Sequence, residues 1–224
     1  SRTLKRLNPK KISTGVYPVI FEAPIATSII SSLVSAISGR NLYRENSFLM
    51  NSIDTKIASN VLTIEEDPYL LRGNASKLFD DEGVQVKKRT VIKDGILNDY
   101  FLSSYSARRL GMKTTGNAGG SHNLLIQNSS ISFDELVTQM DKGLIVTELL
   151  GHGLNMITGD YSRGAAGLWV EGGIVQFAVE EITIASNIKD MLNNIEAIGN
   201  DKYTNGGKYT GSILIKEMTI GSNN

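Results

Sequence analysis

The hydrophobic spacing between residues 24 and 38 predicts an amphipathic helix. Apolar residues recur every three or four positions from Ile25 to Ile37, and serines occupy much of the remaining surface. This period matches the turn of an α-helix. Pro24 is a favourable first-turn residue, and Gly39 stands where a left-handed cap is expected. We therefore expect one wide apolar face and one serine face.

Two later segments also have helical spacing. Residues 132–143 begin with Ser132 and Glu135, the pair that forms a capping box, followed by an apolar stripe. Residues 186–199 begin with Ser186 as the expected N-cap and close at Gly199. A shorter helix is expected at residues 106–111.

Apolar and β-branched runs predict strands through most of the remaining chain. In the run at 16–22, Pro18 favours an edge position. Asp94 and Gly95 suit a tight turn between two β-rich runs. Further strands are expected at 61–68, at the end of 114–128, and at 144–151, 154–159, 167–172, 173–185 and 212–220.

This order of elements indicates the fold class. About ten short strands interrupted by three or four helices, without regular βαβ alternation, indicate an α+β fold. We expect a mostly antiparallel β-sheet, with barrel-like closure as one form it can take, and peripheral helices. No internal repeat or linker divides the chain, so we interpret residues 1–224 as one domain.

The composition excludes some function classes. The 224 residues are 41% hydrophobic and carry 23 basic and 23 acidic side chains. The chain is therefore long enough to bury a sizeable core. Because its charges cancel, it has no net positive charge that would attract it to nucleic acid or to an anionic membrane. The longest uncharged stretch, 23–39, is too short for a membrane-spanning helix. Five basic residues precede position 12, so residues 1–15 are interpreted as a basic arm or linker.

Few residues are available for metal or acid–base chemistry. The absence of cysteine excludes disulfides and thiolate ligands and is compatible with a reducing cytoplasm. His122 and His152 are the only histidines, and neither has a compact metal-binding spacing, although Glu148 or Asp160 could supply a third ligand. Ser121 precedes His122 without the spacing of a nucleophile elbow. Structural hydrogen bonding is the more ordinary role for both histidines.

Glycine clusters flank several predicted strands, at 116–120, 151–153, 159–167 and 172–173. Such glycines permit tight corners of a curved sheet, or they expose backbone groups to an extended peptide that adds as a strand. The sequence leaves both interpretations open and favours the corners. Acidic pairs at 65–66, 80–81 and 180–181 fall in strand ends or turns, where solvation explains them better than catalysis.

Several longer motifs carry a resemblance to a known family. They are TIEEDPYLLRG (63–73), VIKDGIL (91–97), YSARRLGMKTTGNAGGSHN (105–123), GDYSRGAAGLWVEGG (159–173) and VEEITIASNIKDMLNNIEAIGND (179–201). From about Val19 to its end, the chain resembles the C-terminal half of PmbA-type (TldE-type) members of the TldD/PmbA metallopeptidase family. Members typically have an N-terminal domain, which we expect to be absent here because the chain begins at Ser1.

The resemblance implies a cytoplasmic two-subunit peptidase that degrades unstructured peptides and processes microcin-type precursors. In the TldD-type subunit, an HExxxH helix and a late cysteine hold the metal. Here Ile30 and Ser35 stand at the histidine positions and Ser31 at the glutamate position. None of them can replace imidazole or act as the general base. The resemblance thus implies no metal or other cofactor in this chain, and zinc in a TldD-type partner.

The leading hypothesis is therefore a noncatalytic subunit that contacts extended peptides and a TldD-type subunit. It assigns no catalytic residue to this chain, and the serine face of the first helix is expected to face the cavity. Residues expected at a peptide cavity or subunit interface are Gly119, Gly120, Ser121, His122, Asn123, Glu148, Gly151, His152, Gly153, Asp160, Tyr161, Ser162 and Arg163.

Two alternatives remain open from the sequence. One is a self-contained hydrolase that uses His122 or His152. The other is a regulatory protein-binding module, which the family's description as a modulator of DNA gyrase implies. Neither direct nucleic-acid binding nor membrane binding is expected, and homodimerisation of the isolated domain is a further expectation to test.

Overall fold

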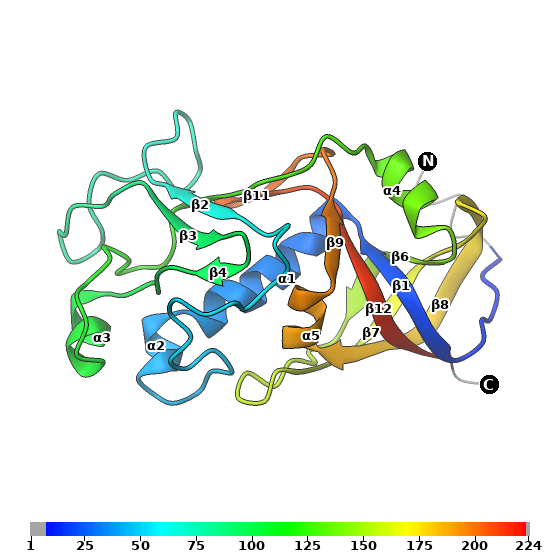
Figure 1. The fold of residues 1–224 in the computed structure, drawn as a ribbon, viewed down its shortest axis with the longest axis horizontal. Helices are drawn as coiled ribbons and strands as arrows, with labels where there is room; N and C mark the ends of the chain where they lie inside the picture. Colours follow the sequence, from blue (N-terminus) through cyan, green and yellow to red (C-terminus); the bar gives the residue numbers. More distant parts are fainter. Residues whose placement is uncertain (1–7, 223–224) are drawn as a thin grey trace.

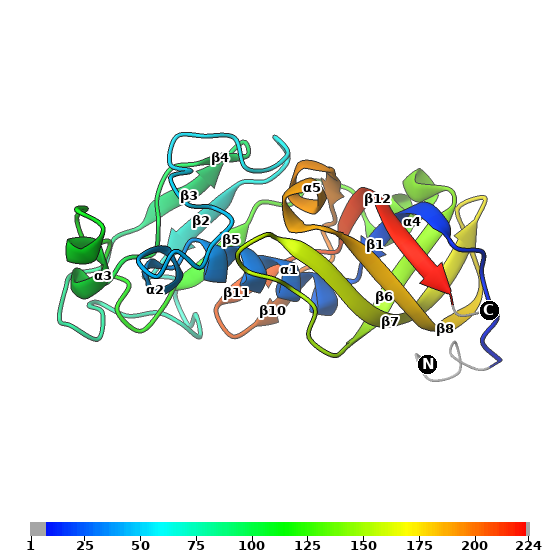
Figure 2. The same ribbon diagram turned by 90° about the horizontal axis from the view of Figure 1, so that it is seen from below.

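The computed structural model describes residues 8–222, so residues 1–7 of the expected basic arm lie outside the described residues. Two six-stranded sheets lie side by side along the long axis of the molecule, with helix α1 (Ala23–Ala36) running from one to the other (Figures 1 and 2). The α+β fold with a mostly antiparallel, barrel-like sheet is confirmed.

The first sheet closes into a barrel of five strands, on which a sixth strand is added. The barrel strands are β1 (Gly15–Phe21), β6 (Gly143–Leu150), β7 (Asp160–Glu171), β8 (Ile174–Asn187) and β12 (Ile213–Ser222). Only the β1–β6 pair is parallel, and β1 also pairs with β12 to complete the closure. The short strand β9 (Ile195–Ile198) adds to β12.

Pro18 does not mark an edge strand, so that expectation is wrong. Strand β1 lies between β6 and β12. The pairing register with β12 shifts between Tyr17 and Val19, on either side of the proline. A local irregularity of this kind accommodates a residue that cannot donate to the ladder, which is how an interior strand tolerates proline.

The second sheet is built from shorter strands. Its order is β10 (Tyr203–Asn205), β11 (Lys208–Thr210), β5 (Asn123–Ile126), β2 (Ile64–Asp67), β3 (Arg89–Lys93) and β4 (Ile96–Leu97). The predicted turn between β3 and β4 is confirmed, since Asp94 and Gly95 both have positive φ, at 49° and 79°. The β10–β11 hairpin was not predicted from the Asn- and Gly-rich sequence.

Within residues 8–222, four other helices are shorter than α1. They are α2 (Gly39–Leu42), α3 (Ser104–Arg109), α4 (Phe133–Met140) and α5 (Ile188–Asn193). The capping box of Ser132 and Glu135 is confirmed at α4. Gly39 begins α2 with ordinary φ instead of closing α1 in a left-handed cap. No helix among residues 8–222 is long and apolar enough to cross a membrane.

The segment expected as one helix at 186–199 divides into a helix and a strand. Helix α5 is capped by the Asn187 side chain, which accepts from the Lys189 amide, and it ends at Asn193. The chain then continues as β9, where Ile195 pairs with Ile215 of β12. Apolar spacing alone could not separate the two, because pairing with β12 buries Ile195 in the extended conformation.

Helix α1 connects the two sheets through the core. Ile29, Ile30 and Leu33 are at most 1% exposed. They belong to one apolar cluster that also contains Val146 of the barrel and Leu124 of the second sheet. In contrast, α4 packs on a smaller cluster at the barrel's outer face. The first helix is therefore a central structural element, unlike the helices at the periphery.

The glycines of β7 serve the close packing of the barrel strands. A Cβ atom on Gly167 would lie 2.0 Å from the Ile145 carbonyl oxygen of β6. The register between β7 and β8 shifts between Ala165 and Gly167. The segment 154–159, expected as a strand, forms the turns between β6 and β7 instead. At Gly167 the glycine permits close approach within the sheet.

Candidate functional site

Helix α1 offers no metal ligands at the positions expected to correspond to a metal helix. Ile30 is fully buried and has no ligating atom. The Ser31 hydroxyl donates to the Thr27 carbonyl at 2.8 Å, and the Ser35 carbonyl accepts from Asn41 Nδ2 at 2.7 Å. Within residues 8–222, no group of three or more His, Cys, Asp or Glu side chains is placed to hold a metal ion. These positions do not fit a catalytic metal.

The glycine-rich loop 116–122 is fixed in place by buried carboxylates. Asp80 is 2% exposed, and its Oδ2 accepts from the Ala118 amide at 2.9 Å. Its Oδ1 accepts from the amides of Glu82 and Val84, each at 2.9 Å. Burial alone would raise the pKa of Asp80, but hydrogen bonds from these three amides lower the pKa below its usual value. The loop is thus held by an ionised side chain.

Glu66 holds the other side of the same loop. It is 1% exposed, and its Oε1 accepts from the His122 amide and from Asn117 Nδ2, each at 2.8 Å. Its Oε2 accepts from Arg89 Nε at 2.8 Å. Arg89 also donates to Asn117 Oδ1 and pairs with Asp99 at 2.7 Å. This network satisfies the buried charges and orders the loop.

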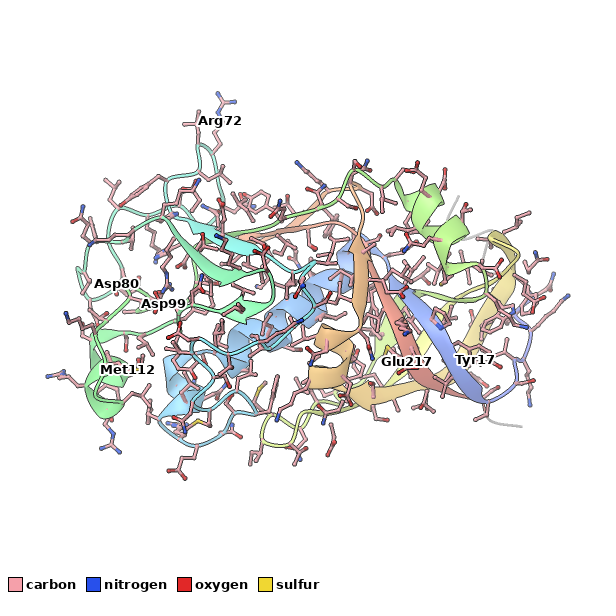
Figure 3. All side chains as sticks on the ribbon, in the orientation of Figure 1. Tyr17, Arg72, Asp80, Asp99, Met112 and Glu217 are labelled. Carbon is pink, nitrogen blue, oxygen red and sulfur yellow. The ribbon has the colours of Figure 1, made fainter. Side chains whose placement is uncertain are left out.

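The glycine loop forms one wall of a hollow of about 540 Å³, which we call the loop hollow. Of the residues expected at a site, Gly119, Gly120 and Ser121 line it. Figure 3 shows Asp80, Asp99 and Met112 near this end of the molecule, away from Tyr17 and Glu217 on the barrel. The lining also includes Val34, Ser38, Arg40, Tyr43, Phe101 and Tyr105, among others. From α1, only its C-terminal end contributes to this hollow, through Val34.

Most of the remaining predicted residues lie in the loop between β6 and β7 or at the start of β7. An open hollow of about 530 Å³ is lined there by His152, Gly153, Asp160, Tyr161 and Ser162. We call it the β7 hollow. Glu148, half-buried on β6 opposite Ala166, does not line it. The structure therefore places eight of the thirteen expected residues in two separate hollows, whereas His122, Asn123, Glu148, Gly151 and Arg163 line neither.

Two polar atoms beside the β7 hollow have no hydrogen-bond partner in the described part of the chain. They are the Tyr161 hydroxyl oxygen and Arg163 Nε, both buried. Burial raises the pKa of Tyr161, and the positive charge of Arg163 opposes that shift. Another nitrogen of Arg163 donates to the Gly151 carbonyl at 2.5 Å. Arg163 thereby ties β7 to the neighbouring loop.

The two histidines do not form one site. His122 is 4% exposed, and its Nε2 lies 3.0 Å from the Gly116 carbonyl oxygen. His152 is exposed in the β7 hollow. Asp160, which also lines the β7 hollow, accepts from Thr158 and Asn187. His122 therefore has the structural hydrogen-bonding role that its sequence context favoured.

Sequence reasoning missed the acidic residues that organise the loop. It interpreted the pairs at 65–66 and 80–81 as solvated, which is wrong for Glu66 and Asp80. One signal was available for the first pair. Adjacent residues of a strand point to opposite faces, so two neighbouring acids on a sheet with one covered face cannot both be solvated.

Comparison with known proteins identifies a family that matches this chain. Residues 14–222 match the family described as PmbA/TldA metallopeptidase C-terminal domain. The chain is 52% identical over 219 residues to Metalloprotease PmbA of Escherichia coli O157:H7, covering 98% of this chain and 49% of the relative. It thus spans about half the length of that curated relative.

Solved structures show the same arrangement of elements. A Bacteroides thetaiotaomicron protein described as a candidate modulator of DNA gyrase superposes with a TM-score of 0.94 at 31% identity, over 99% of this chain and 50% of that one. TldE from Thermococcus kodakarensis superposes with a TM-score of 0.86 at 25% identity, over 98% of this chain and 53% of that one. These similarities cover the barrel, the second sheet and both hollows.

Proposed function

The chain belongs to the PmbA/TldA metallopeptidase family through its C-terminal domain, and from this premise we propose that it is the noncatalytic part of a two-subunit peptidase. A TldD-type partner carries the catalytic zinc in this proposal. The present chain contributes walls of the peptide chamber and part of the subunit interface. The enzyme acts in the cytoplasm on unstructured peptides, including microcin-type precursors.

The observation that carries the proposal is the chemistry of α1. Ile30 is buried in the core, and the Ser31 hydroxyl is occupied within its own helix. A zinc site needs imidazole, thiolate or carboxylate donors converging on one point, and a peptidase site needs a general base beside it. The helix at these positions supplies neither. In a family named for metallopeptidase activity, this favours a division of labour between subunits.

The proposal also concerns the half of the curated relative that this chain does not cover. The chain covers about half of its curated relative, and the family description places it at the C-terminal end. We propose that an N-terminal half precedes it in the complete subunit and takes part in assembly. The fair test therefore uses the complete protein.

The experiment compares the complete protein alone, a TldD-type protein alone, and the two mixed. We expect the protein alone to contain no stoichiometric zinc and to show no chelator-sensitive cleavage of an unstructured peptide. The mixture should form a stable complex on size exclusion and cleave the peptide. Metal analysis of each peak assigns the zinc to one subunit.

Chelator-sensitive cleavage by the protein alone would overturn this proposal. A His122→Ala, His152→Ala double variant then tests the self-contained hydrolase, because these are the only histidines in the 224 residues of this chain. A matched partner variant, with its metal-helix glutamate replaced by glutamine, should abolish activity of the mixture without preventing assembly.

A second candidate function is regulation through protein binding. Large apolar side chains remain exposed on the segment between β2 and β3, where Leu71 is 88%, Leu78 70% and Phe79 62% exposed. Such exposure favours contact with another protein. The description of the Bacteroides structure suggests gyrase as that protein. A pull-down with gyrase and with the TldD-type protein, repeated with Leu78→Ser, distinguishes the two partners.

A further inference from the structure

The loop hollow has a one-sided charge. Its lining contains one charged side chain, Arg40, and no acidic side chain. Arg44, Arg108 and Arg109 are exposed on α3 and on the segment after α2. Among residues 8–222, none of these four arginines makes a salt bridge. Arg40 is therefore the one charged side chain that the lining itself offers to a ligand.

Aromatic rings hold part of this arginine group in position. The Arg44 and Arg109 guanidinium carbons lie 5.7 Å and 6.0 Å from the Tyr43 ring centroid. Tyr43 in turn packs edge-to-face against Tyr105 at 5.5 Å. Both tyrosines line the hollow. Arg44 Nε also donates to the Tyr43 hydroxyl at 3.3 Å. A ring contact itself uses no N–H donor, so most guanidinium donors of these arginines stay available to a ligand.

Three acidic side chains near the glycine loop are already engaged. Asp81 lies against Gly119, but it pairs with Lys77 Nζ at 2.7 Å. Glu82 accepts from the Ser104 amide at 2.7 Å. Asp80 accepts from three loop amides. These interactions reduce the charge that the acids present to the hollow.

Two backbone amides of the glycine loop have no hydrogen-bond acceptor among residues 8–222. The amides of Gly119 and Ser121 donate to no group within the described part of the chain, whereas Ala118, Gly120 and His122 donate to protein acceptors. Gly119 and Gly120 have φ values of +90° and +117°, which residues with a side chain rarely adopt. Successive amides in such a loop form a concavity that suits an anion.

We propose that the loop hollow binds the terminal carboxylate of an extended peptide, with Arg40 and the amides of Gly119 and Ser121 as donors. Arginine and backbone amides match the planar geometry of a carboxylate. Val34, Phe101 and the tyrosines offer apolar surface to the last side chains, and about 540 Å³ is the size of a small-molecule site. The choice of a peptide carboxylate over another anion rests on the proposed function.

The test measures binding to the chain itself, without partner or activity. An N-acetylated tripeptide with a free carboxylate is titrated into ¹⁵N-labelled protein, alongside the same tripeptide as its C-terminal amide and inorganic phosphate. We expect the free acid to shift the amide signals of Gly119, Gly120 and Ser121. The amidated peptide should bind at least about tenfold more weakly, since hydrogen bonds to a charged acceptor are stronger than those to a neutral one.

Arginine substitutions test which side chain donates to the peptide carboxylate. Arg40→Gln should reduce binding of the free acid to the level of the amide, and Arg40→Lys should restore part of it. Arg72→Gln is the matched control, since Arg72 lies at the tip of the distant loop between β2 and β3 (Figure 3). Arg40 is exposed and makes no salt bridge with any described residue, so its replacement leaves the fold intact.

Three outcomes would overturn the inference: equal affinity for free acid and amide, unchanged binding by Arg40→Gln, or Arg40-dependent binding of phosphate but not of the peptide acid. Each leaves the proposed subunit function standing, because that function is measured by metal content and activity of the assembled complex. Failure of assembly, conversely, leaves this binding experiment unaffected.

Discussion

The two sheets of this molecule are stabilised by different interactions. The barrel is closed, its long strands pair along most of their length, and its interior is apolar. The second sheet is open, its strands have two to five residues, and buried carboxylates lie on its strand β2 and in the loop that follows. Neither of the buried carboxylates, Glu66 and Asp80, lies on a barrel strand.

This difference indicates that the barrel serves as the scaffold and that the second sheet carries the candidate site. A closed barrel buries apolar surface and leaves no strand edge, so it is stable without specific polar contacts. In an open sheet with short strands, the backbone hydrogen bonds between strands are too few to hold long loops in place. The Glu66–Arg89–Asn117 network and Asp80 do so instead, and the loop they hold is a wall of the loop hollow. Removing these polar contacts should therefore affect the two regions unequally.

The largest effect is expected from Glu66→Ala. Removing one member of a buried ion pair leaves its partner desolvated and uncompensated, which costs about 3 to 5 kcal/mol. Arg89, the His122 amide and Asn117 would each lose an acceptor. Urea unfolding gives the free energy, and hydrogen exchange should show the loss of protection concentrated in the second sheet.

Glu65→Ala is the matched control for that change. Glu65 lies next to Glu66 on β2, but its side chain is 45% exposed and its contact with Lys88 is 3.5 Å. An exposed pair of this kind contributes less than about 1 kcal/mol. Equal destabilisation by the two substitutions would contradict a special role for the buried network.

A smaller, pH-dependent effect is expected from Asp80→Asn. The amide donors hold the pKa of Asp80 below its usual value despite burial, which would raise it. A depressed pKa in the folded state stabilises the protein above the unfolded pKa of about 4, and this contribution is lost as pH falls through the folded pKa. Replacing the carboxylate should cost about 1 to 3 kcal/mol at neutral pH.

The measurement is the free energy of unfolding of both proteins between pH 7 and pH 3. The two curves should converge toward pH 3. Protonated Asp80 no longer carries the negative charge, which asparagine lacks at every pH. Exchange of the Ala118 amide should accelerate in the variant at pH 7. A constant difference at every pH would show that Asp80 acts through packing and not through its charge.

The comparison also explains which features the sequence predicts. The α4 capping box and the Asp94–Gly95 turn follow from local rules, and both are confirmed. Strand β9 and the interior position of Pro18 depend on which distant strand pairs alongside, and no local pattern contains that information. Barrel closure belongs with them, since it needs β1 to meet both β6 and β12.

The candidate site divides in the same way. The glycine clusters at 116–120 and 151–153 indicated both hollow-lining loops from composition alone. The sequence could not show that they line separate hollows, or that Glu66 and Arg89 meet from neighbouring strands. Those relations are set by sheet register, in which a shift of one residue would turn Glu66 to the opposite face.

The smallest effect is expected in the barrel, from Ile215→Val. Ile215 is fully buried on β12 and pairs with Val19 and Ile195, so the change removes one methylene group from an apolar environment. Such deletions cost about 0.5 to 1.5 kcal/mol. Because no charged group is involved, the loss should be the same at pH 7 and pH 4 and unaffected by salt. Binding of the free-acid tripeptide in the loop hollow should also be unchanged, since the network that fixes its wall does not include β12. A pH-dependent loss, or weakened peptide binding, would mean that the barrel and the polar network are energetically coupled, and the separation of scaffold from site would then fail.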